Sequence, residues 1–291
     1  MASVVTFFSQ FPVLFVVTVG LLGLIVGSFL NVVIARLPVI LEKRWRRECL
    51  DFLGQAGEEP EERFDLAWPP SHCPHCRHQI GPWENIPVLS WFMLRGHCRH
   101  CGQKISLRYP VVETVTAALS LAVAWRFGVT IETLWALVLT WNLVALTLID
   151  IDHQLLPDAI TLPLLWLGLL LSLFDVFTDS ASAIVGAASG YMILWSVFHL
   201  FRLVTGKEGM GYGDFKLLAL FGAWFGWQKL PLVILLSSLV GALLGLFMIL
   251  FRGRDRNIPI PFGPYLAVAG WLAMMWGDEI NAWYLHLSGL N

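Results

Sequence analysis

The chain has 291 residues, of which 57% are hydrophobic and only 14% are charged, and its mean hydropathy is +0.68. A soluble domain carries about 25% charged residues, so this composition argues against a soluble enzyme and indicates a membrane protein. The formal net charge of −2 gives no electrostatic case for nucleic acid as a partner.

The N-terminal segment is apolar from its start. Its first 35 residues contain no charged residue, and the first basic residue, Arg36, follows the apolar run. A cleavable signal peptide would need a basic N-terminal region and a small-residue cleavage site, and neither is present. We therefore expect a retained membrane span whose N-terminus lies on the outer side of the membrane.

Further apolar runs follow along the chain. A helix needs about 20 residues to cross about 30 Å of hydrocarbon, and eight runs meet or approach this length. The sixth is short, and Gly222 and Gly226 interrupt it. The eight runs lie near residues 11–35, 110–126, 131–149, 160–177, 181–203, 215–228, 231–251 and 263–285. Three of them contain G-x-x-x-G, which we interpret as helix-packing positions: Gly23/Gly27, Gly186/Gly190 and Gly241/Gly245.

Basic residues fix the predicted orientation, because cytoplasmic loops carry an excess of Lys and Arg. With an outside N-terminus and eight spans, the cytoplasmic loops are 36–109, 150–159, 202–216 and 252–262, and they hold 17 of the 19 Lys and Arg residues. The basic run Lys43–Arg47 is expected to lie against anionic lipid headgroups. The acidic stretch Glu58–Glu62 is expected to be a solvated linker.

Four of the five cysteines form two C-x-x-C pairs in the first cytoplasmic loop: Cys73, Cys76, Cys98 and Cys101. Two such turns can complete the four-sulfur tetrahedral shell of structural zinc. Disulfides or a redox pair are the alternatives, but cytoplasmic thiols stay reduced. The predicted fold is therefore an all-α polytopic membrane protein of about eight transmembrane helices, with a small zinc-binding cytoplasmic insertion after the first.

Two aspartates lie at the ends of apolar runs on the same predicted face. Asp150 ends the run 131–149, and Asp214 closes the turn Gly211-Tyr212-Gly213-Asp214 before the sixth run. A carboxylate at mid-bilayer depth costs roughly 2.5–3.5 kcal/mol on insertion scales, so such groups face a cavity or a partner. Asp152 points away from Asp150 on a helix, and Asp158 could cap the next helix. Asp214 could equally N-cap the sixth span.

Two carboxyl groups at one site suggest acid–base chemistry. Neighbouring carboxylates do not both ionise easily, so one keeps its proton near neutral pH. The ionised group can take a proton from a water that attacks a peptide carbonyl, and the protonated group can polarise that carbonyl. This chemistry needs no metal.

These motifs together closely resemble the type IV prepilin peptidases, which are bifunctional leader peptidases and N-methyltransferases. The matching segments are 27–33 with 36–38, the two C-x-x-C turns, 84–87, 108–110, 150–158, 206–215 and 260–265. The G-x-G-D turn is also shared with presenilin-like intramembrane aspartyl proteases. The resemblance implies that Asp150 and Asp214 are the catalytic pair. It also implies cleavage of prepilin and pseudopilin leaders at the cytoplasmic face of the bacterial inner membrane.

The resemblance further implies methylation of the new N-terminal amine with S-adenosylmethionine as methyl donor. No Rossmann-type G-x-G-x-x-G follows a strand, and Arg95 and Gly96 beside the second C-x-x-C are weak cofactor-binding candidates. A turn that enters the zinc knuckle explains these two residues equally well. The closed zinc site has a structural role. The expected divisions are a first transmembrane helix at 1–37, a zinc-binding and methyltransferase domain at 38–109, and a peptidase domain at 110–291.

Three alternatives make different predictions. A non-catalytic assembly protein would tolerate replacement of both aspartates. A transporter that uses the aspartates as a proton or cation relay would show inverted repeats, and the cysteine-bearing loop has no counterpart later in the chain. A peptidase without methyltransferase activity is the third alternative, and the resemblance implies that such family members lack this large loop.

Overall fold

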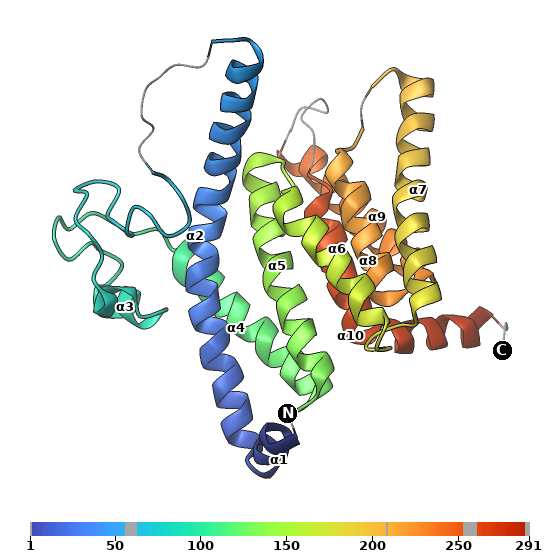
Figure 1. The fold of residues 1–291 in the computed structure, drawn as a ribbon, viewed down its shortest axis with the longest axis horizontal. Coiled ribbons are helices and arrows are strands. Elements are labelled where there is room, and N and C mark those ends of the chain that lie inside the picture. The colour runs from blue at the N-terminus through green and yellow to red at the C-terminus, as the bar shows by residue number, and fades with distance from the viewer. Residues whose placement is uncertain (1, 56–62, 208, 253–260, 289–291) are drawn as a thin grey trace. The chain divides into compact units, whose positions relative to one another are not determined.

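The structure is a computed structural model that describes residues 2–55, 63–207, 209–252 and 261–288. Within these ranges the regular elements are helices, with two isolated β-bridges and no strand, and most of the segment 63–107 is irregular (Figure 1). The predicted all-α class is therefore confirmed. The predicted acidic linker at Glu58–Glu62 and the loop arginines Arg254 and Arg256 lie outside the described residues.

Each of the eight predicted apolar runs overlaps one helix, although the runs 160–177 and 215–228 extend past the ends of theirs. These helices are α2 (Pro12–Phe52), α4 (Arg108–Phe127), α5 (Ile131–His153), α6 (Asp158–Ser172), α7 (Ser180–Thr205), α8 (Tyr212–Phe225), α9 (Leu230–Arg252) and α10 (Gly263–Ser288). Shorter elements are α1 (Ala2–Gln10), α3 (Leu89–Met93) and the 3-10 turns η1 (Pro82–Asn85) and η2 (Trp227–Lys229). Among the described helices, α2, α4, α5 and α7 are each long and apolar enough to cross a membrane, while α6 and the segment Trp227–Leu243 are shorter apolar helices.

The chain divides into two compact units, Met1–Thr133 and Leu134–Asn291. The first holds α1 to α4 and the cysteine-bearing segment, and the second holds most of α5 and all of α6 to α10. The three-part division at residues 37 and 109 stays a prediction.

In the N-terminal unit, two glycines let α2 and α4 approach closely. A Cβ atom on Gly23 would lie 2.8 Å from the Ala117 Cα, and one on Gly27 would lie 2.7 Å from the Glu113 Cα. The first G-x-x-x-G is therefore a helix-packing motif, as predicted. Helix α2 does not end near residue 35, because it continues through Pro38 to Phe52. Its 41 residues span about 60 Å at 1.5 Å per residue.

Helix α8 is the centre of the C-terminal unit. Every residue from Leu217 to Phe225 is buried, so this part of the helix is apolar on all sides and has no face left for solvent. Helices α6, α7, α9 and α10 all pack against it. Backbone meets backbone where Gly222 faces Gly186 on α7 and where Gly190 faces Leu218. The predicted interruption of this helix occurs at Gly226, with a φ of +78°, and not at Gly222.

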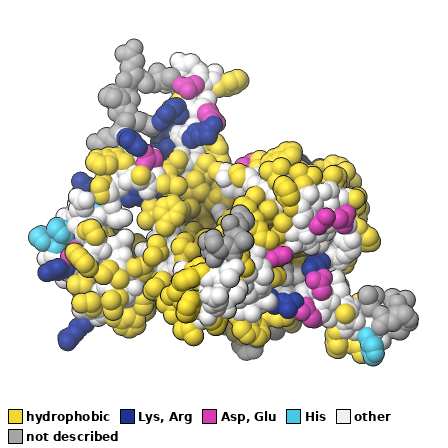
Figure 2. Space-filling view, turned by 60° about the horizontal axis from the view of Figure 1, so that its bottom comes forward, with side chains coloured by type: hydrophobic (Ala, Val, Ile, Leu, Met, Phe, Trp, Pro, Cys, Tyr) yellow, Lys and Arg dark blue, Asp and Glu magenta, His cyan; other side chains and the backbone are white. Residues whose placement is uncertain are grey.

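The outer surface is apolar over wide areas. Figure 2 shows hydrophobic side chains over most of the visible face, with few charged groups among them. Helix α6 alone exposes Leu162, Trp166 and Leu170. Exposed apolar surface on this scale is typical of a protein that contacts lipid, which agrees with the membrane class inferred from composition.

Candidate functional site

The structure brings Asp150 and Asp214 together in the C-terminal unit. Asp150 lies in the last turn of α5 and is 5% exposed, while Asp214 is the third residue of α8 and is 6% exposed. The two carboxyl groups are close enough to interact electrostatically. Asp214 does not cap α8, because the helix begins at Tyr212 and Gly211 occupies the N-cap position. The capping alternative for Asp214 is therefore wrong.

Two glycines allow other segments to approach this pair closely. A Cβ atom on Gly263, the first residue of α10, would lie 2.6 Å from Asp150 Oδ2. One on Gly213 would lie 2.8 Å from the Leu156 Cβ, and Leu156 also borders Gly263. Glycine at positions 213 and 263 thus permits three segments, α5, α8 and the start of α10, to meet at the two carboxyl groups.

One oxygen of this pair lacks a partner. Within the described residues, Asp150 Oδ2 is the single buried side-chain oxygen or nitrogen without a hydrogen bond to the protein. Leaving a buried polar atom unsatisfied costs about 1–3 kcal/mol, so its retention calls for an explanation. An acceptor that is kept available for a reacting molecule is such an explanation.

The remaining aspartates of the α5–α6 segment lie outside the pair. Asp152 is exposed, as expected from its position on the helix. Asp158 begins α6, whose N-cap is Pro157, so it does not cap that helix. Its carboxylate oxygens lie 2.6 and 2.8 Å from Lys216 Nζ on α8. This ion pair connects the two aspartate-bearing segments beside the buried pair.

The four cysteines of the N-terminal unit form one cluster. Their Sγ atoms all lie within 4.8 Å of one another, and those of Cys73 and Cys101 are 3.8 Å apart. A tetrahedron with metal–sulfur bonds of about 2.3 Å has edges of about 3.8 Å, so the cluster fits one tetrahedral metal ion. A disulfide would need about 2.05 Å, and all five cysteines are free.

The two C-x-x-C turns have the same local structure. Cys73 N donates to His78 O at 2.9 Å, and Cys98 N donates to Gln103 O at 2.8 Å. Each turn reverses through a residue in the left-handed region, Arg77 with a φ of 56° and Gly102 with a φ of 70°. Backbone N–H groups of Cys76 and His75 lower the pKa of the Cys73 thiol, whereas the pKa of the Cys101 thiol is raised, with the neighbouring thiols among the causes.

The histidines beside the cysteines have other contacts. His72 Nδ1 lies 3.0 Å from Pro70 O, and His97 Nδ1 lies 2.7 Å from Arg95 O. The rings of His78 and His100 stack at 4.7 Å between the two turns. The metal-ligand set of this cluster therefore consists of sulfur atoms, in agreement with the sequence pattern.

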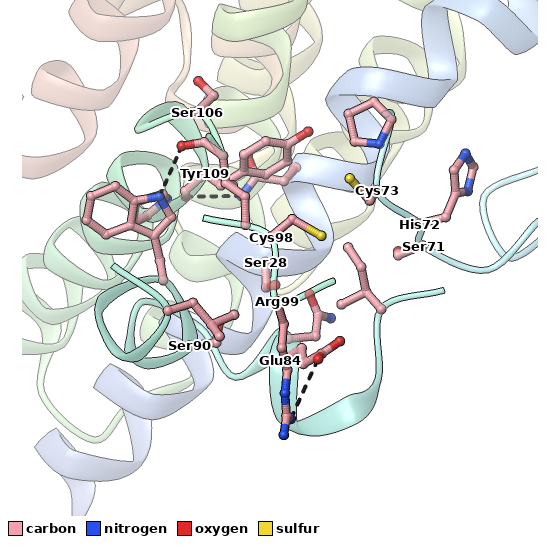
Figure 3. A pocket seen from close by; sticks show the side chains of 18 of the residues that line it. Ser28, Ser71, His72, Cys73, Glu84, Ser90, Cys98, Arg99, Ser106 and Tyr109 are labelled. Carbon is pink, nitrogen blue, oxygen red and sulfur yellow. Dashed lines mark hydrogen bonds and ion pairs between the residues drawn. The ribbon is translucent and has the colours of Figure 1, made fainter. Parts of the chain in front are cut away.

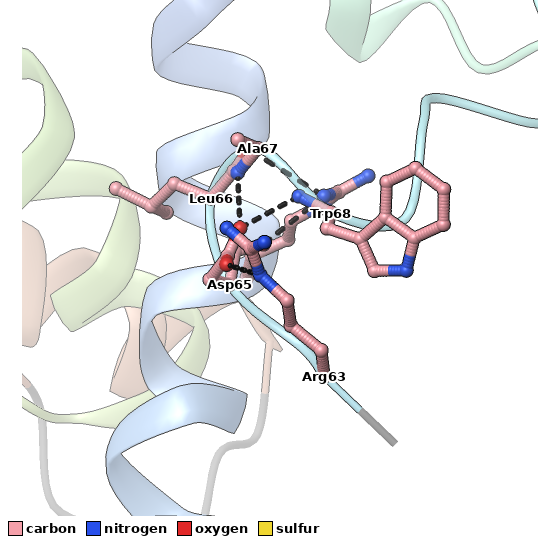
Figure 4. A network of polar contacts seen from close by, with 6 residues as sticks. Arg63, Asp65, Leu66, Ala67 and Trp68 are labelled. Carbon is pink, nitrogen blue, oxygen red and sulfur yellow. Dashed lines mark hydrogen bonds and ion pairs between the residues drawn. The ribbon is translucent and has the colours of Figure 1, made fainter.

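A polar network ties the chain that leads into the first turn to helix α2 (Figure 4). The Asp65 carboxylate accepts hydrogen bonds from Arg63 Nε at 2.6 Å and from the backbone N–H groups of Ala67 and Trp68. The Arg63 hydrogen bond, followed by these backbone bonds, lowers the pKa of Asp65. Arg36 on α2 donates to Asp65 O at 3.1 Å.

A cavity of about 470 Å³ lies in the same unit, between α2, the cysteine turns and the start of α4. Figure 3 shows side chains from these segments around it, with Cys73 and Cys98 among them. Its volume is in the range of about 300–1,000 Å³ that is typical of small-molecule sites. Its polar and aromatic lining includes Ser28, Asn31, Glu84, Trp91, Tyr109 and Glu113.

Arg95 and Gly96 do not line this cavity. They form the left-handed turn that enters the second cysteine pair, with φ values of 52° and 70°. A Cβ atom on Gly96 would lie 2.7 Å from the Trp91 Cζ2, so glycine at this position allows the indole ring to pack against the backbone. Both residues therefore belong to the turn, and their role as cofactor contacts stays a prediction.

Sequence reasoning missed two residues that the structure places at these sites. Gly263 borders Asp150, and Glu113 on α4 is 7% exposed and lines the cavity. The signal for Glu113 was present, because it is an ionisable residue inside the apolar run 110–126. No local pattern marks Gly263 as a neighbour of Asp150, since that contact joins distant segments.

Comparison with known proteins agrees with this arrangement. Residues 21–127 match the bacterial peptidase A24 N-terminal domain, and residues 137–246 match the type IV leader peptidase family. The chain is 56% identical over 284 residues to a Pseudomonas putida protein named prepilin leader peptidase/N-methyltransferase, with 98% of each chain covered.

The chain belongs to the type IV leader peptidase family. Proteins of the same printed name from Pseudomonas aeruginosa and Legionella pneumophila are 55% and 46% identical, covering 97% and 95% of this chain and 98% and 96% of theirs. No solved structure matches the chain. Membership makes the chain a peptidase, and the two family segments fall within the two structural units.

Proposed function

We propose that this membrane protein is an aspartic endopeptidase that removes the leader of type IV prepilins and pseudopilins and then N-methylates the new N-terminal residue with S-adenosylmethionine. Asp150 and Asp214 form the catalytic pair. The observation that carries the proposal is the buried Asp150 Oδ2, which lacks a partner beside a second buried carboxyl group. The names of relatives that cover nearly the whole chain support both activities.

The pair acts on a water molecule and a peptide bond. One carboxylate takes a proton from water, whose oxygen then bonds to the carbonyl carbon of the scissile peptide. The other carboxyl group is protonated and donates a hydrogen bond to the carbonyl oxygen. When the C–N bond breaks, the leaving amine nitrogen takes up a proton from the pair. Asp150 Oδ2 has no protein hydrogen bond to give up when it receives the water.

The cysteine cluster holds structural zinc in this proposal. Cys73, Cys76, Cys98 and Cys101 would fill all four positions of a tetrahedral ion, which leaves none for substrate. The surrounding segment, 38–109, forms the methyltransferase part together with α2 and α4, which share its compact unit, and the C-terminal unit from Leu134 onward forms the peptidase part. The zinc segment and both aspartates lie on the cytoplasmic side of the bacterial inner membrane. The partners of the protein are its prepilin substrates and membrane lipid, and not nucleic acid.

One experiment tests both activities. A prepilin is incubated with the purified protein and S-adenosylmethionine, and its intact mass is measured. We expect loss of the leader together with a gain of one methyl group. Loss of the leader alone would leave a peptidase without methyltransferase activity. An unchanged substrate, with a folded and inserted protein, would refute the proposal as a whole.

Substitution of either aspartate tests the catalytic pair. Asp150→Asn and Asp214→Asn keep the volume of the side chain but cannot accept the proton from water, so we expect cleavage to fall by at least about a thousandfold. Asp152→Asn is the matched control, because this exposed carboxylate lies outside the pair and should leave cleavage unchanged. Residual cleavage near the wild-type rate in either buried variant would remove that aspartate from the mechanism.

Metal content tests the zinc assignment. Purified protein should contain one zinc per chain, and a chelator should expose segment 63–107 to limited proteolysis, because structural metal contributes directly to folding. As a control, Cys49→Ser should keep the zinc, since this exposed cysteine on α2 is not part of the cluster. Full protease resistance after complete removal of the metal would contradict the structural role.

A further inference from the structure

Glu113 is a buried carboxylate that the peptidase proposal does not use. It projects from α4 at the point where Gly27 of α2 comes closest, and it lines the 470 Å³ cavity. Its partners in the described part of the chain are neutral. Val88 N donates to Glu113 Oε2 at 2.7 Å, and the Ser28 hydroxyl is its other hydrogen-bonding neighbour. Buried charges are usually paired, so a carboxylate among neutral donors at a cavity wall is suited to a cationic ligand.

The backbone around Glu113 supports a dedicated role. Val88, the donor to Glu113, has a φ of +61°, which is a strained conformation for a β-branched residue. Such strain costs of order 1–3 kcal/mol and is concentrated at ligand-binding and catalytic positions. Here the strained residue directs its N–H at one carboxylate oxygen, so that the orientation of the Glu113 side chain is fixed before a ligand arrives.

The second acidic residue of the cavity differs from Glu113. Glu84 accepts a hydrogen bond from Gly81 N at 3.2 Å, and its other oxygen lies 3.8 Å from the Arg99 guanidinium. Glu84 therefore already has a cationic neighbour and a local role in the η1 turn. Of the two carboxylates, Glu113 is the one whose charge is left for a ligand.

The rest of the lining fits an adenosyl cofactor. Trp91 and Tyr109 offer aromatic faces for a base, and Trp91 is held in place by a 3.3 Å hydrogen bond from its Nε1 to Ile105 O. Ser90, Ser106 and Asn31 add polar groups around the same space. The lining also carries the basic side chains Arg36, Arg99 and Lys104, which can pair with a carboxylate of the same ligand. The volume, the aromatic rings and the two signs of charge together match an adenosyl group that carries both a sulfonium and a carboxylate.

We propose that this cavity is the S-adenosylmethionine site and that Glu113 supplies the negative charge that binds the sulfonium. The inference rests on the proposed methyltransferase function and assigns it a site. When bound, the cofactor supplies a methyl group whose carbon bonds to the substrate amine nitrogen as its bond to sulfur breaks. The electron pair stays on sulfur, which becomes a neutral thioether, and the amine gives up a proton to water. Glu113 therefore favours the cofactor over the neutral product.

Direct binding tests the inference without any turnover. Dissociation constants for S-adenosylmethionine and for S-adenosylhomocysteine are measured by equilibrium dialysis with purified full-length protein and no prepilin. Glu113→Gln keeps an oxygen that can accept from Val88 N but removes the charge. A hydrogen bond to a charged group contributes about 1.5–3 kcal/mol, so we expect S-adenosylmethionine binding to weaken by roughly ten- to hundredfold. Binding of S-adenosylhomocysteine, whose sulfur is a neutral thioether, should change by about threefold or less.

Matched measurements separate this role from a structural one. Thr116→Val alters a buried side chain one turn along α4 that does not line the cavity, and it should leave both constants unchanged. Unchanged zinc content and leader cleavage in Glu113→Gln would show that the variant is folded. Sinefungin is an unreactive analogue that carries an amine near the sulfonium position. Its dissociation constant should rise in Glu113→Gln by a factor similar to that of S-adenosylmethionine.

Two results would overturn the inference. One is unchanged S-adenosylmethionine affinity in Glu113→Gln, and the other is an equal loss of affinity for the cationic and the neutral ligand. In either case a wild-type protein that still cleaves and methylates prepilin leaves the proposed function intact. If the wild type neither cleaves nor methylates prepilin, the proposed function itself has failed.

Discussion

Replacing Gly263 by alanine should impair cleavage while leaving the fold almost unchanged. The new Cβ atom would lie 2.6 Å from Asp150 Oδ2, whereas ordinary contact begins at 3.4 Å, so the carboxylate must move by about 0.8 Å. Its other close neighbour, Leu156 Cδ1 at 3.2 Å, is also the end of a side chain. No backbone atom stands in the way of the methyl group, and no positive φ strains alanine at this position.

The two consequences of this shift differ in size. A misplacement of about 1 Å in a catalytic group can cost 10²-fold in rate, so we expect leader cleavage by Gly263→Ala to fall roughly tenfold to a hundredfold. The free energy of unfolding should fall by less than about 1 kcal/mol, because flexible side-chain ends can adjust. The assays are the initial rate of prepilin cleavage in detergent and the thermal unfolding midpoint of the same preparation.

A control variant isolates the position from the substitution. Gly20→Ala adds the same methyl group to α2, where its nearest neighbour is the flexible Leu121 Cδ2 at 3.4 Å. It should change neither the cleavage rate nor the unfolding midpoint by much. If Gly263→Ala cleaved within about twofold of the wild-type rate, the contact between Gly263 and Asp150 would not control the position of the catalytic carboxylate.

Two further predictions concern local backbone and charge. Arg77→Gly should stabilise the N-terminal unit by up to about 1 kcal/mol and Gly102→Ala should destabilise it by a similar amount, since both positions have φ between 50° and 75°; equal effects of the two on the unfolding midpoint would contradict this. At the start of α7, a hydrogen bond with the Ser182 side chain, then the Ser182 backbone N–H, lowers the pKa of Asp179. The stability from this N-cap is therefore present above the usual Asp pKa and is lost as pH falls through the lowered value. Asp179→Asn keeps the cap without titrating, so its unfolding midpoint should fall less than that of wild type between about pH 6 and pH 2.

The helices were predictable because a bilayer restricts the backbone conformations that a chain can adopt. Backbone groups in lipid must be satisfied within the segment, so a long apolar run forms a helix whatever its details. The ends were less predictable. Helix α2 continues for 17 residues beyond the predicted end at residue 35, through the basic run Lys43–Arg47. Hydropathy marks where lipid contact stops, but it does not mark where a helix stops.

The cysteine cluster was predictable for a different reason. The C-x-x-C spacing is a local constraint, because two thiols on one turn already point at one ion, and only the meeting of two turns needs the fold. The structure satisfies that condition with sulfur atoms within 4.8 Å. The contact of Gly263 with Asp150 has no such local part, since it joins residues more than 100 positions apart.

Buried charge is the signal that connects the sites. Among the described residues, three carboxyl side chains are buried, and they are Glu113, Asp150 and Asp214. Each lies in or at the end of an apolar run, where a charge is costly unless a partner or a ligand compensates for it. Two of them were recognised from the sequence because Asp150 ends an apolar run and Asp214 closes a glycine-rich turn before another. Glu113 was not, because the run around it resembles a simple membrane span. Its oxygens have hydrogen bonds, but its burial against α2 leaves its charge without a described cationic partner, and a cationic cofactor in the adjoining cavity would compensate for that charge.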